Sequence, residues 1–281
     1  MAQESSQETS RGGRLLNTFA DRPVQDHGSG WSNLWDAGES NLWDRGKASP
    51  ALVDLVEGAG ELFDPFTIQG TKKNVLVPGC GRGYDVVMLA LHGFNAYGLE
   101  ISDTAVKAAE AYAASQMSHP SAYHFGNEQS RSSSPGTVTF LKGDFFSPTW
   151  DFKGEPNGIR KFDMAYDYTF LCAIDPSQRR NWAKSMGQII KPGGLLICLE
   201  FPLYKDPKLP GPPWGLNGVH WNLLVEGKDG EIRGENIGDD GKEMNSSQTD
   251  DGDFRRISYM KPTRSYEQGR GTDMLSMYIR K

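Results

Sequence analysis

The chain has 281 residues, of which 37% are hydrophobic and 23% charged, so it holds one large α/β domain or two small ones and is not wholly disordered. No apolar run approaches the roughly 18–20 residues of a membrane span, and the polar first residues do not resemble a secretory signal. The net charge is −6 and no stripe of Lys or Arg is present, which argues against a nucleic-acid substrate.

The three cysteines, Cys80, Cys172 and Cys198, lie in or beside apolar segments and share no C-x-x-C spacing. An odd number of such thiols is typical of a reducing compartment, and their spacing is not that of metal ligands. We therefore expect a cytoplasmic monomer that holds no metal and has neither membrane nor nucleic-acid partners. Cys172 is expected to be a small buried filler rather than a nucleophile.

The N-terminal part of the chain is polar and precedes the folded domain. Residues 1–30 are expected to form a mobile tail, within which 15–19 open a short helix. Residues 31–281 are expected to form a single domain. It begins with a tryptophan-rich stretch, followed by a helix at 50–56 that starts with proline and continues with apolar residues.

From residue 74 onward, short apolar runs alternate with segments of helical periodicity. Strands are expected at 75–77, 96–99, 138–141, 162–168 and 195–201, and a closing antiparallel pair at 255–260 and 274–279. Helices are expected at 84–91, 104–116 and 176–190. Ser102 is the expected N-cap of the second of these helices, and a turn at 191–194 ends the third.

This alternation predicts an α/β fold with a mostly parallel, seven-stranded sheet covered by helices on both faces. Two segments, 118–136 and 227–253, are longer than a connection requires and rich in small or acidic residues. Both are interpreted as exposed loop insertions.

The strongest local signal is Val-Leu-Val-Pro-Gly-Cys-Gly-Arg-Gly at 75–83, followed by Glu100 at the end of the second strand. Gly79 and Gly81 let a cofactor approach the strand end closely, and the acid accepts hydrogen bonds from ribose hydroxyls. Dinucleotide enzymes share this logic but usually show G-x-G-x-x-G, whereas this chain has G-x-G-x-G, which does not prepare a helix N-terminus for a diphosphate. The alternative is a glycine turn without a ligand.

Two further features follow in the order that a methyl-donor site requires. Asp144, after the third strand, is suited to accept the adenine amino group, and Phe145 is suited to flank the ring. Lys-Pro-Gly-Gly at 191–194, before an apolar strand, resembles a turn of Class I methyltransferases. Each feature alone is usually an ordinary acid or turn, but together they favour S-adenosylmethionine as the cofactor.

The chain resembles the thiopurine S-methyltransferase superfamily, and within it the plant and fungal halide/thiol methyltransferases. The resemblance is strongest from about residue 31 to 201. It rests on Trp-x-x-x-Trp-Asp-x-Gly at 31–38, Leu-Trp-Asp-Arg-Gly-Lys at 42–47, Val-Pro-Gly-Cys-Gly-x-Gly-Tyr-Asp at 77–85 and Asp-Tyr-Thr-Phe-Leu-Cys-Ala-Ile at 167–174. It implies a Rossmann-like Class I fold and methyl transfer from S-adenosylmethionine to a small thiol, thiocyanate or halide.

The resemblance also implies site residues. It places cofactor contacts at Trp31, Trp35, Trp43, Gly79, Glu100, Asp144 and the pair Asp167 and Tyr168. Of these we expect Asp167 and Tyr168 to be catalytic, with Tyr168 orienting the acceptor. One additional residue between Trp35 and Trp43, Trp214 in place of a commoner tyrosine, and the long insertions depart from the family pattern. They bear on the identity of the acceptor more than on the reaction.

The residue types suit this chemistry independently. A sulfonium is a cation and tryptophan faces attract cations, so the three tryptophans are expected to form a lid over the cofactor, although simple packing of the N-terminal segment is an alternative. An anionic acceptor needs positioning but no general base, and a thiol with a pKa near 8.5 needs little help. None of the five histidines occupies a recognisable catalytic position; His220 is the strongest candidate.

Residues 202–221 follow the fifth strand and carry Tyr204, Trp214 and Trp221 among several prolines. In an open α/β sheet, ligands bind outside the carboxyl ends of the strands. We therefore expect these aromatic residues to form a stiff wall beside the methyl donor, although Trp214 could instead only pack the proline-rich loop.

Three alternative functions remain open from the sequence. The acceptor could be a larger thiol-bearing metabolite. An NAD(P)-dependent oxidoreductase would have the longer glycine spacing and a Tyr-x-x-x-Lys or His pair, which are not found. A non-catalytic protein that keeps the cofactor fold is the third.

Overall fold

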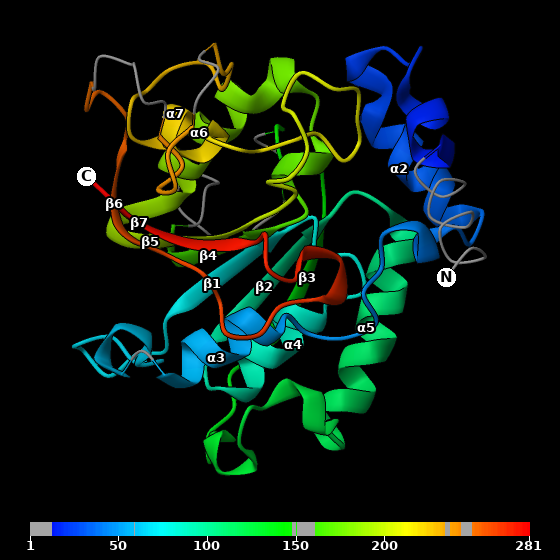
Figure 1. Ribbon diagram of the computed structural model, residues 1–281. Coiled ribbons are helices and arrows are strands. Elements are labelled where there is room, and N and C mark those ends of the chain that lie inside the picture. Colours follow the sequence, from blue (N-terminus) through cyan, green and yellow to red (C-terminus); the bar gives the residue numbers. More distant parts are fainter. Residues whose placement is uncertain (1–12, 59, 148–149, 151–160, 234–236, 243–248) are drawn as a thin grey trace.

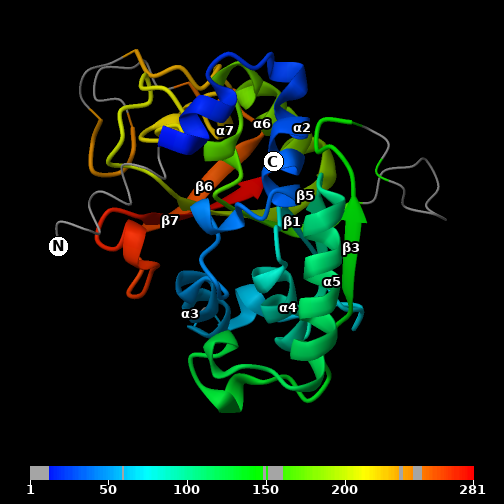
Figure 2. The ribbon, with the colours of Figure 1, turned by 90° about the vertical axis from the view of Figure 1, so that its right-hand side faces the viewer.

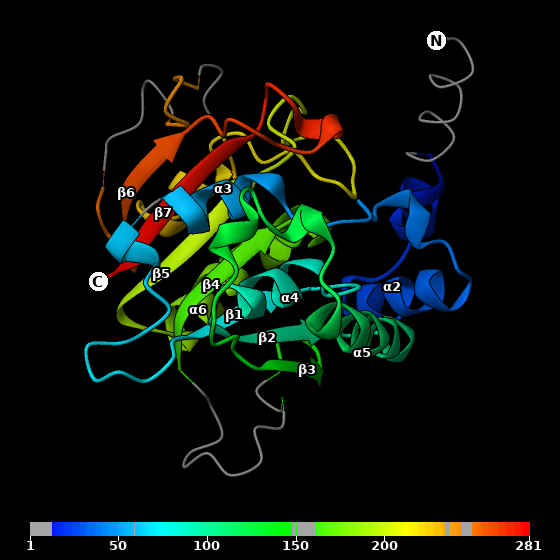
Figure 3. The ribbon, with the colours of Figure 1, turned by 90° about the horizontal axis from the view of Figure 1, so that it is seen from below.

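The computed structural model describes residues 13–58, 60–147, 150, 161–233, 237–242 and 249–281. All seven strands of these residues belong to one sheet, in the order β3-β2-β1-β4-β5-β7-β6 (Figure 3). The strands are β1 Asn74–Pro78, β2 Asn95–Glu100, β3 Val138–Lys142, β4 Phe162–Tyr168, β5 Ile190–Glu200, β6 Phe254–Met260 and β7 Met274–Arg280.

The five strands from β3 to β5 run parallel, whereas β7 is antiparallel to both β5 and β6. The expected mostly parallel sheet with a closing antiparallel pair is therefore confirmed. The chain passes from β1 to β2 and β3 on one side and later returns to β4 on the other side of β1. Ligands bind at such a switch point, outside the carboxyl ends of the strands.

Helices cover both faces of the sheet. In Figures 1 and 2, α3, α4 and α5 lie on one face and α6 and α7 on the other, while α2 lies beyond one end of the sheet. The helices are α2 His27–Asp36, α3 Pro50–Gly58, α4 Tyr84–Leu91, α5 Asp103–Ser118, α6 Arg179–Ile189 and α7 Val219–Leu224. Among the described residues, no helix is both long enough and apolar enough to cross a membrane.

Local sequence accounts for the elements nearest the switch point. Strands β1 and β2 are buried from their second residue onward, as expected for continuous apolar runs with helices on both faces. Helix α5 begins where predicted, because the hydroxyl of Ser102 accepts a hydrogen bond from the Ala105 amide at 3.2 Å.

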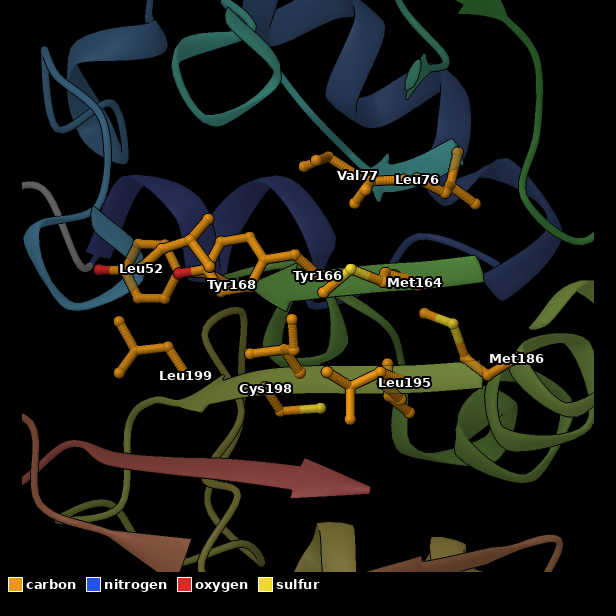
Figure 4. Close-up of a cluster of buried hydrophobic side chains, with 14 of the residues drawn as sticks. Leu52, Leu76, Val77, Met164, Tyr166, Tyr168, Met186, Leu195, Cys198 and Leu199 are labelled. Carbon is orange, nitrogen blue, oxygen red and sulfur yellow. The ribbon is translucent and has the colours of Figure 1, made fainter. Parts of the chain in front are cut away.

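The core lies between the sheet and its helices. Along β4, side chains alternate between the faces, so Met164, Tyr166 and Tyr168 share the face covered by α3 and α4. Figure 4 shows Tyr166 and Tyr168 on the same side of β4 as Leu52 of α3.

The structure differs from the predictions in two places. Residues 13–19 are helical and α2 begins at His27, so the described part of the expected tail is mostly helical; residues 1–12 lie outside the described residues. This segment is held by an apolar cluster of Leu15, Phe19 and Leu34. The expected turn at 191–194 lies within β5, where the pairing with β4 shifts register and Gly193 has a φ of 77°.

Parts of the two expected insertions are also described. The segment 118–136 contains short 3-10 turns and is tied to α3, because the carboxylate of Glu57 accepts hydrogen bonds from the amides of Gly126 and Asn127. The segment 227–253 is described except for 234–236 and 243–248, which lie outside the described residues.

Candidate active site

A cavity of about 1100 Å³ opens at the carboxyl ends of the parallel strands. Strand-end residues line it, among them Val77 of β1, Glu100 of β2 and Tyr168 of β4, and Phe201 just after β5. Residues of α2 and of several loops also line it. The cavity therefore spans the switch point of the sheet, where the fold predicts a ligand.

The glycine turn after β1 forms one side of this cavity. Gly79, Gly81 and Gly83 have φ values of 58°, 52° and 74°, which residues with a side chain rarely adopt. A Cβ atom at Gly79 would collide with the ring of Phe170, and one at Gly81 would lie 3.4 Å from the Trp35 ring. Gly79 and Gly81 line the cavity, so the turn presents bare backbone to a ligand.

Glu100 lies at the end of β2 and is 6% exposed. Its carboxylate accepts hydrogen bonds from the amides of Gly81 at 3.1 Å, Ile101 at 2.8 Å and Ser102 at 3.1 Å. Burial raises the pKa of Glu100, and these hydrogen bonds oppose the rise. A carboxylate has about four acceptor positions. One therefore remains for a ligand hydroxyl, and a second hydroxyl would share a position with a backbone amide.

Asp144 and Phe145 follow β3 and both line the cavity, as predicted. The Oδ1 atom of Asp144 accepts a hydrogen bond from the Phe146 amide at 2.9 Å, which fixes the carboxylate at the cavity wall. The ring of Phe145 packs edge-on against Phe170, with centroids 5.1 Å apart, and stacks on Trp150 at 5.8 Å. A planar ligand ring would meet a rigid aromatic surface here.

The three predicted tryptophans also come together at the cavity. Trp31 and Trp35 are one helical turn apart on α2, so they share a face. Trp43 packs edge-on against both, at 5.2 Å from Trp31 and 5.6 Å from Trp35. The guanidinium of Arg82 lies 5.5 Å from the Trp35 ring, so a protein cation already occupies one face of that indole.

Tyr168 and Asp167 are separated by the alternation of β4. Tyr168 lines the cavity, stacks on Tyr266 at 5.1 Å, and has a pKa that burial raises, so its hydroxyl stays protonated. Asp167 points to the opposite face and does not line the cavity. Its carboxylate accepts hydrogen bonds from the Trp182 indole at 2.9 Å and the Leu171 amide at 3.1 Å. Asp167 therefore contacts residues on the other side of the sheet rather than the cavity, and the catalytic role expected for it stays a prediction.

The expected aromatic wall is formed only in part. Tyr204 lines the cavity. Trp214 is buried outside the lining, with its ring 6.3 Å from that of His27, and Trp221 packs between Lys242 and Arg256, each 4.4 Å from its ring. Neither tryptophan lines the cavity: Trp214 packs against Gly211 of the proline-rich loop, and Trp221 packs against two cationic side chains. This outcome is the packing alternative foreseen for Trp214.

The histidine and cysteine positions bear on nucleophile and base chemistry. His220 is buried behind the sheet, 3.6 Å from the Glu200 carboxylate, and does not line the cavity. His27 does line it, and its Nε2 atom lies 3.1 Å from the Arg22 carbonyl oxygen. Cys172 also lines the cavity, but burial raises the pKa of its thiol to about 12, so it remains protonated at neutral pH.

Several lining residues were not predicted. Arg45 lies inside the Trp-Asp-Arg-Gly-Lys stretch, two residues after Trp43, and this position was the signal that could have found it. Thr169, with a φ of 60°, follows the predicted strand β4. Tyr266 comes from the loop before β7, and no local pattern places that loop at the switch point.

These residues fit S-adenosylmethionine. The bare turn admits close approach of a ligand, Glu100 offers an acceptor for a ribose hydroxyl, and Asp144 with Phe145 offers an acid and a ring for adenine. The cavity volume exceeds the roughly 300–1000 Å³ of typical small-molecule sites, which leaves room for an acceptor beside the donor. Fold and site together define an S-adenosylmethionine-dependent methyltransferase of Class I.

Comparisons with known proteins give the family. The model of the thiopurine S-methyltransferase family matches residues 27–233, so the chain belongs to this family. It is 38% identical over 201 residues to the probable thiol methyltransferase 2 of Arabidopsis thaliana, covering 72% of this chain and 73% of that protein. It is also 38% identical over 186 residues to the thiocyanate methyltransferase 1 of Brassica oleracea, covering 66% of each.

Solved structures agree on the fold. The magnesium protoporphyrin IX methyltransferase of Synechocystis PCC 6803, crystallised with bound S-adenosylhomocysteine, superposes with a TM-score of 0.50 at 14% identity. The match covers 91% of this chain and 100% of that one. The family membership and this fold together favour a methyltransferase over the two alternatives, an NAD(P)-dependent oxidoreductase and a non-catalytic protein.

Proposed function

We propose that this enzyme transfers a methyl group from S-adenosylmethionine to a small, soft nucleophile, namely a thiol, thiocyanate or halide. The observation that carries the proposal is the continuation of the cavity from the glycine turn to an aromatic region at the ends of β4 and β5. Tyr168, Phe201 and Tyr204 line that region. The names of the plant relatives, a thiol and a thiocyanate methyltransferase, support this acceptor class.

The glycine side of the cavity is the donor half. Here Glu100 would hold the ribose hydroxyls, Asp144 and Phe145 the adenine, and the backbone of Gly79 and Gly81 would allow close approach. When bound, S-adenosylmethionine supplies a methyl group on a positively charged sulfonium sulfur, and this sulfur becomes a neutral thioether when the methyl group is transferred. Trp31 and Trp43 cover this half and exclude water, which strengthens the attraction of indole faces for a cation.

The aromatic side is the acceptor half. The protonated hydroxyl of Tyr168 donates a hydrogen bond that orients the acceptor, and the surrounding rings hold it in line with the methyl group. An anion needs no proton removed. A thiol would release its proton to solvent before transfer, because its pKa near 8.5 is close to physiological pH.

A panel of acceptors tests the proposal. Initial rates with isotopically labelled S-adenosylmethionine would be measured for a small thiol, thiocyanate, iodide, and oxygen analogues of the thiol. We expect sulfur acceptors to react at least tenfold faster than oxygen analogues of the same shape, because apolar walls desolvate a soft sulfur more easily than a hard oxygen. Equal rates for oxygen and sulfur would contradict the assignment.

A larger thiol-bearing metabolite is the second candidate acceptor, and the cavity volume of about 1100 Å³ favours it. A longer acceptor would reach solvent past Tyr204, which lines the cavity and is 63% exposed. A series of thiols of increasing length distinguishes the two candidates. Rising kcat/KM with length would favour the metabolite, and a constant or falling value the small acceptor.

We further propose that the protein acts as a cytoplasmic monomer without a nucleic-acid partner. Its three cysteines are all free thiols, which suits a reducing compartment, and the net charge of −6 does not suit a phosphate backbone. Size-exclusion chromatography with light scattering would test the oligomeric state, with a mass near 31.1 kDa expected.

A further inference from the structure

Three cationic side chains line the cavity: Arg45, Arg82 and Lys205. The charge of Arg82 is neutralised, because its Nε atom lies 2.8 Å from the Asp44 carboxylate. Lys205 donates hydrogen bonds to two backbone carbonyls of the proline-rich loop, at 2.6 and 2.7 Å. Two of the three cations are therefore already committed to partners within the protein.

Arg45 is differently placed. Its Nε atom donates a long hydrogen bond of 3.4 Å to the hydroxyl oxygen of Tyr168, and its guanidinium lies 5.5 Å from the Phe201 ring centre. In the part of the chain that the structure describes, no carboxylate lies within ion-pair distance of this guanidinium. Burial raises the pKa of Asp273 and the Arg45 charge lowers it, but the two side chains form no ion pair. Most of the five N–H donors of Arg45 are thus available to a ligand.

The contacts of Arg45 place it in the acceptor half. Tyr168 and Phe201 lie at the ends of β4 and β5, on one side of β1, whereas Glu100 lies at the end of β2 on the other side. Arg45 therefore stands opposite the donor-binding acid. A cation here repels the positively charged methyl donor and attracts a negatively charged acceptor.

The surroundings of Arg45 strengthen such an attraction. Arg45 is half-buried, and the rings of Tyr168, Tyr266 and Phe201 that line the same cavity are buried. Charge–charge interactions are stronger where water is partly excluded. Because Arg45 donates to the oxygen of Tyr168, the hydroxyl hydrogen of that tyrosine is free to point at the same ligand. A guanidinium and a hydroxyl then offer converging donors to a single negative charge.

We propose that Arg45 binds the negative charge of the acceptor, so that the acceptor class is a soft monoanion, such as thiocyanate, iodide or a thiolate, rather than a neutral thiol. This inference rests on the proposed function and narrows its acceptor. Arg45 acts as a binding residue of the acceptor half and takes no proton.

The test compares Arg45→Gln, Arg45→Lys and the control Arg264→Gln in the full chain. The substitution Arg264→Gln removes the same charge as Arg45→Gln. In the wild-type protein Arg264 pairs with Asp54 of α3 and does not line the cavity. Thiocyanate would be titrated calorimetrically into each protein with S-adenosylhomocysteine bound. We expect Arg45→Gln to weaken thiocyanate binding at least tenfold, Arg45→Lys to weaken it less, and Arg264→Gln to leave it unchanged. The affinity for S-adenosylhomocysteine should stay within twofold in all three.

Two results would overturn the assignment: wild-type thiocyanate affinity in Arg45→Gln, or an equal loss of affinity for S-adenosylhomocysteine in that variant. Thermal unfolding shows whether Arg45→Gln is folded. If it is not, Arg45→Lys decides: thiocyanate affinity within tenfold of wild type supports the need for a positive charge at this position. An Arg45→Lys variant that is folded but binds no thiocyanate contradicts it. Wild-type protein that methylates neither thiols nor thiocyanate would contradict the proposed function itself. Transfer to thiocyanate that persists undiminished in Arg45→Gln would contradict only the role of Arg45.

Discussion

Glu100 joins the glycine turn to the end of β2. Its buried carboxylate accepts three backbone amides, including that of Gly81, and still leaves an acceptor position facing the cavity. The same side chain therefore both shapes the turn and binds a ligand there. Loss of its carboxylate affects both roles, and they have to be measured separately.

We expect Glu100→Ala to weaken binding of S-adenosylmethionine by about 1.5–3 kcal/mol, the range for hydrogen bonds to a charged group. The variant should also unfold at a lower temperature, because three amides lose their acceptor. Isothermal calorimetry gives the affinity and thermal unfolding the stability. Glu100→Gln is the matched control, since it keeps a hydrogen-bond acceptor and should lose less of both. An unchanged dissociation constant in Glu100→Ala would contradict the ribose assignment.

At the residue scale, the sequence predicted the donor half better than the acceptor half. Gly79 directly follows β1 and Glu100 is the last residue of β2, so their positions depend only on local pattern. The sequence did not separate Asp167 from Tyr168, because adjacent strand residues face opposite sides and no local pattern says which side holds the cavity. Tyr168 lines the cavity and Asp167 does not, so the catalytic role of Asp167 stays a prediction. Trp214 was misplaced because a proline-rich loop has no periodicity from which to infer orientation.

At the scale of elements, α2 carries the cover of the donor half. Together with residues 13–19 it packs around a small apolar cluster of Leu15, Phe19 and Leu34 that is separate from the main core. A hydrogen bond joins α2 to the rest of the protein: the hydroxyl of Thr104 in α5 donates to the carboxylate of Asp36. A separate, small cluster should open at lower free energy than the main core does.

We therefore expect S-adenosylhomocysteine to protect the segment up to Trp43 from limited proteolysis, because a bound ligand gives its tryptophans a surface to cover. Rates of cleavage in this segment, with and without the ligand, are the measurement. Cleavage in 118–136, which lies outside the cavity lining, is the internal control and should not change. Equal cleavage of the N-terminal segment in both states would show that it is not a lid.

Helix α4 contributes an acid to the cavity in its first turn. Burial raises the pKa of Asp85 from 3.8 to about 7, although the Ser49 amide donates a hydrogen bond to it at 2.7 Å. Between about pH 4 and pH 7 the folded chain keeps a proton on Asp85 that the unfolded chain has released. Raising the pH across this range therefore weakens folding.

Asp85→Asn should remove this contribution, since the amide oxygen still accepts from Ser49 but carries no charge. We compare the free energy of unfolding of the variant with that of wild type at each pH. The difference, variant minus wild type, should be larger at pH 8 than at pH 5 by roughly 1–4 kcal/mol, because a tenfold change in an acid dissociation constant corresponds to about 1.4 kcal/mol. Urea unfolding at both pH values is the measurement. A stability difference that does not depend on pH would mean that Asp85 is charged in the folded protein throughout.

The strands and main helices could be predicted because their apolar periodicity is strong and glycine turns or caps delimit them. The helical character of residues 13–36 was largely missed, since Gly28, Ser29 and Gly30 are poor helix formers. Packing of Phe19 against Trp31, with centroids 4.8 Å apart, is one tertiary contact that stabilises this segment. Local propensity does not report such a contact.

At the scale of the whole molecule, the sheet brings together a donor half after β1, β2 and β3 and an acceptor half after β4 and β5. Residues from the N-terminal helix, five strand ends and the loop before β7 meet in one cavity. Residues far apart in the sequence meet here: Tyr266 lines the same cavity as Arg45, and its hydroxyl donates a hydrogen bond to the Lys47 carbonyl oxygen at 2.8 Å. In the function proposed above, the enzyme methylates an acceptor bound in this cavity. The acceptor reacts as an anion, and no group of the enzyme removes its proton.

The most direct test measures kcat/KM for a simple thiol and for thiocyanate between pH 5.5 and 9.5, and takes their ratio at each pH; the range brackets a thiol pKa of about 8.5. Titration of Asp85 affects both acceptors and cancels in the ratio. Since thiocyanate is an anion throughout, we expect the ratio of thiol to thiocyanate to rise about tenfold per pH unit below the thiol pKa and to level off above it. A ratio that does not change with pH would contradict this mechanism, because it would mean that a group of the enzyme, rather than solvent, removes the thiol proton.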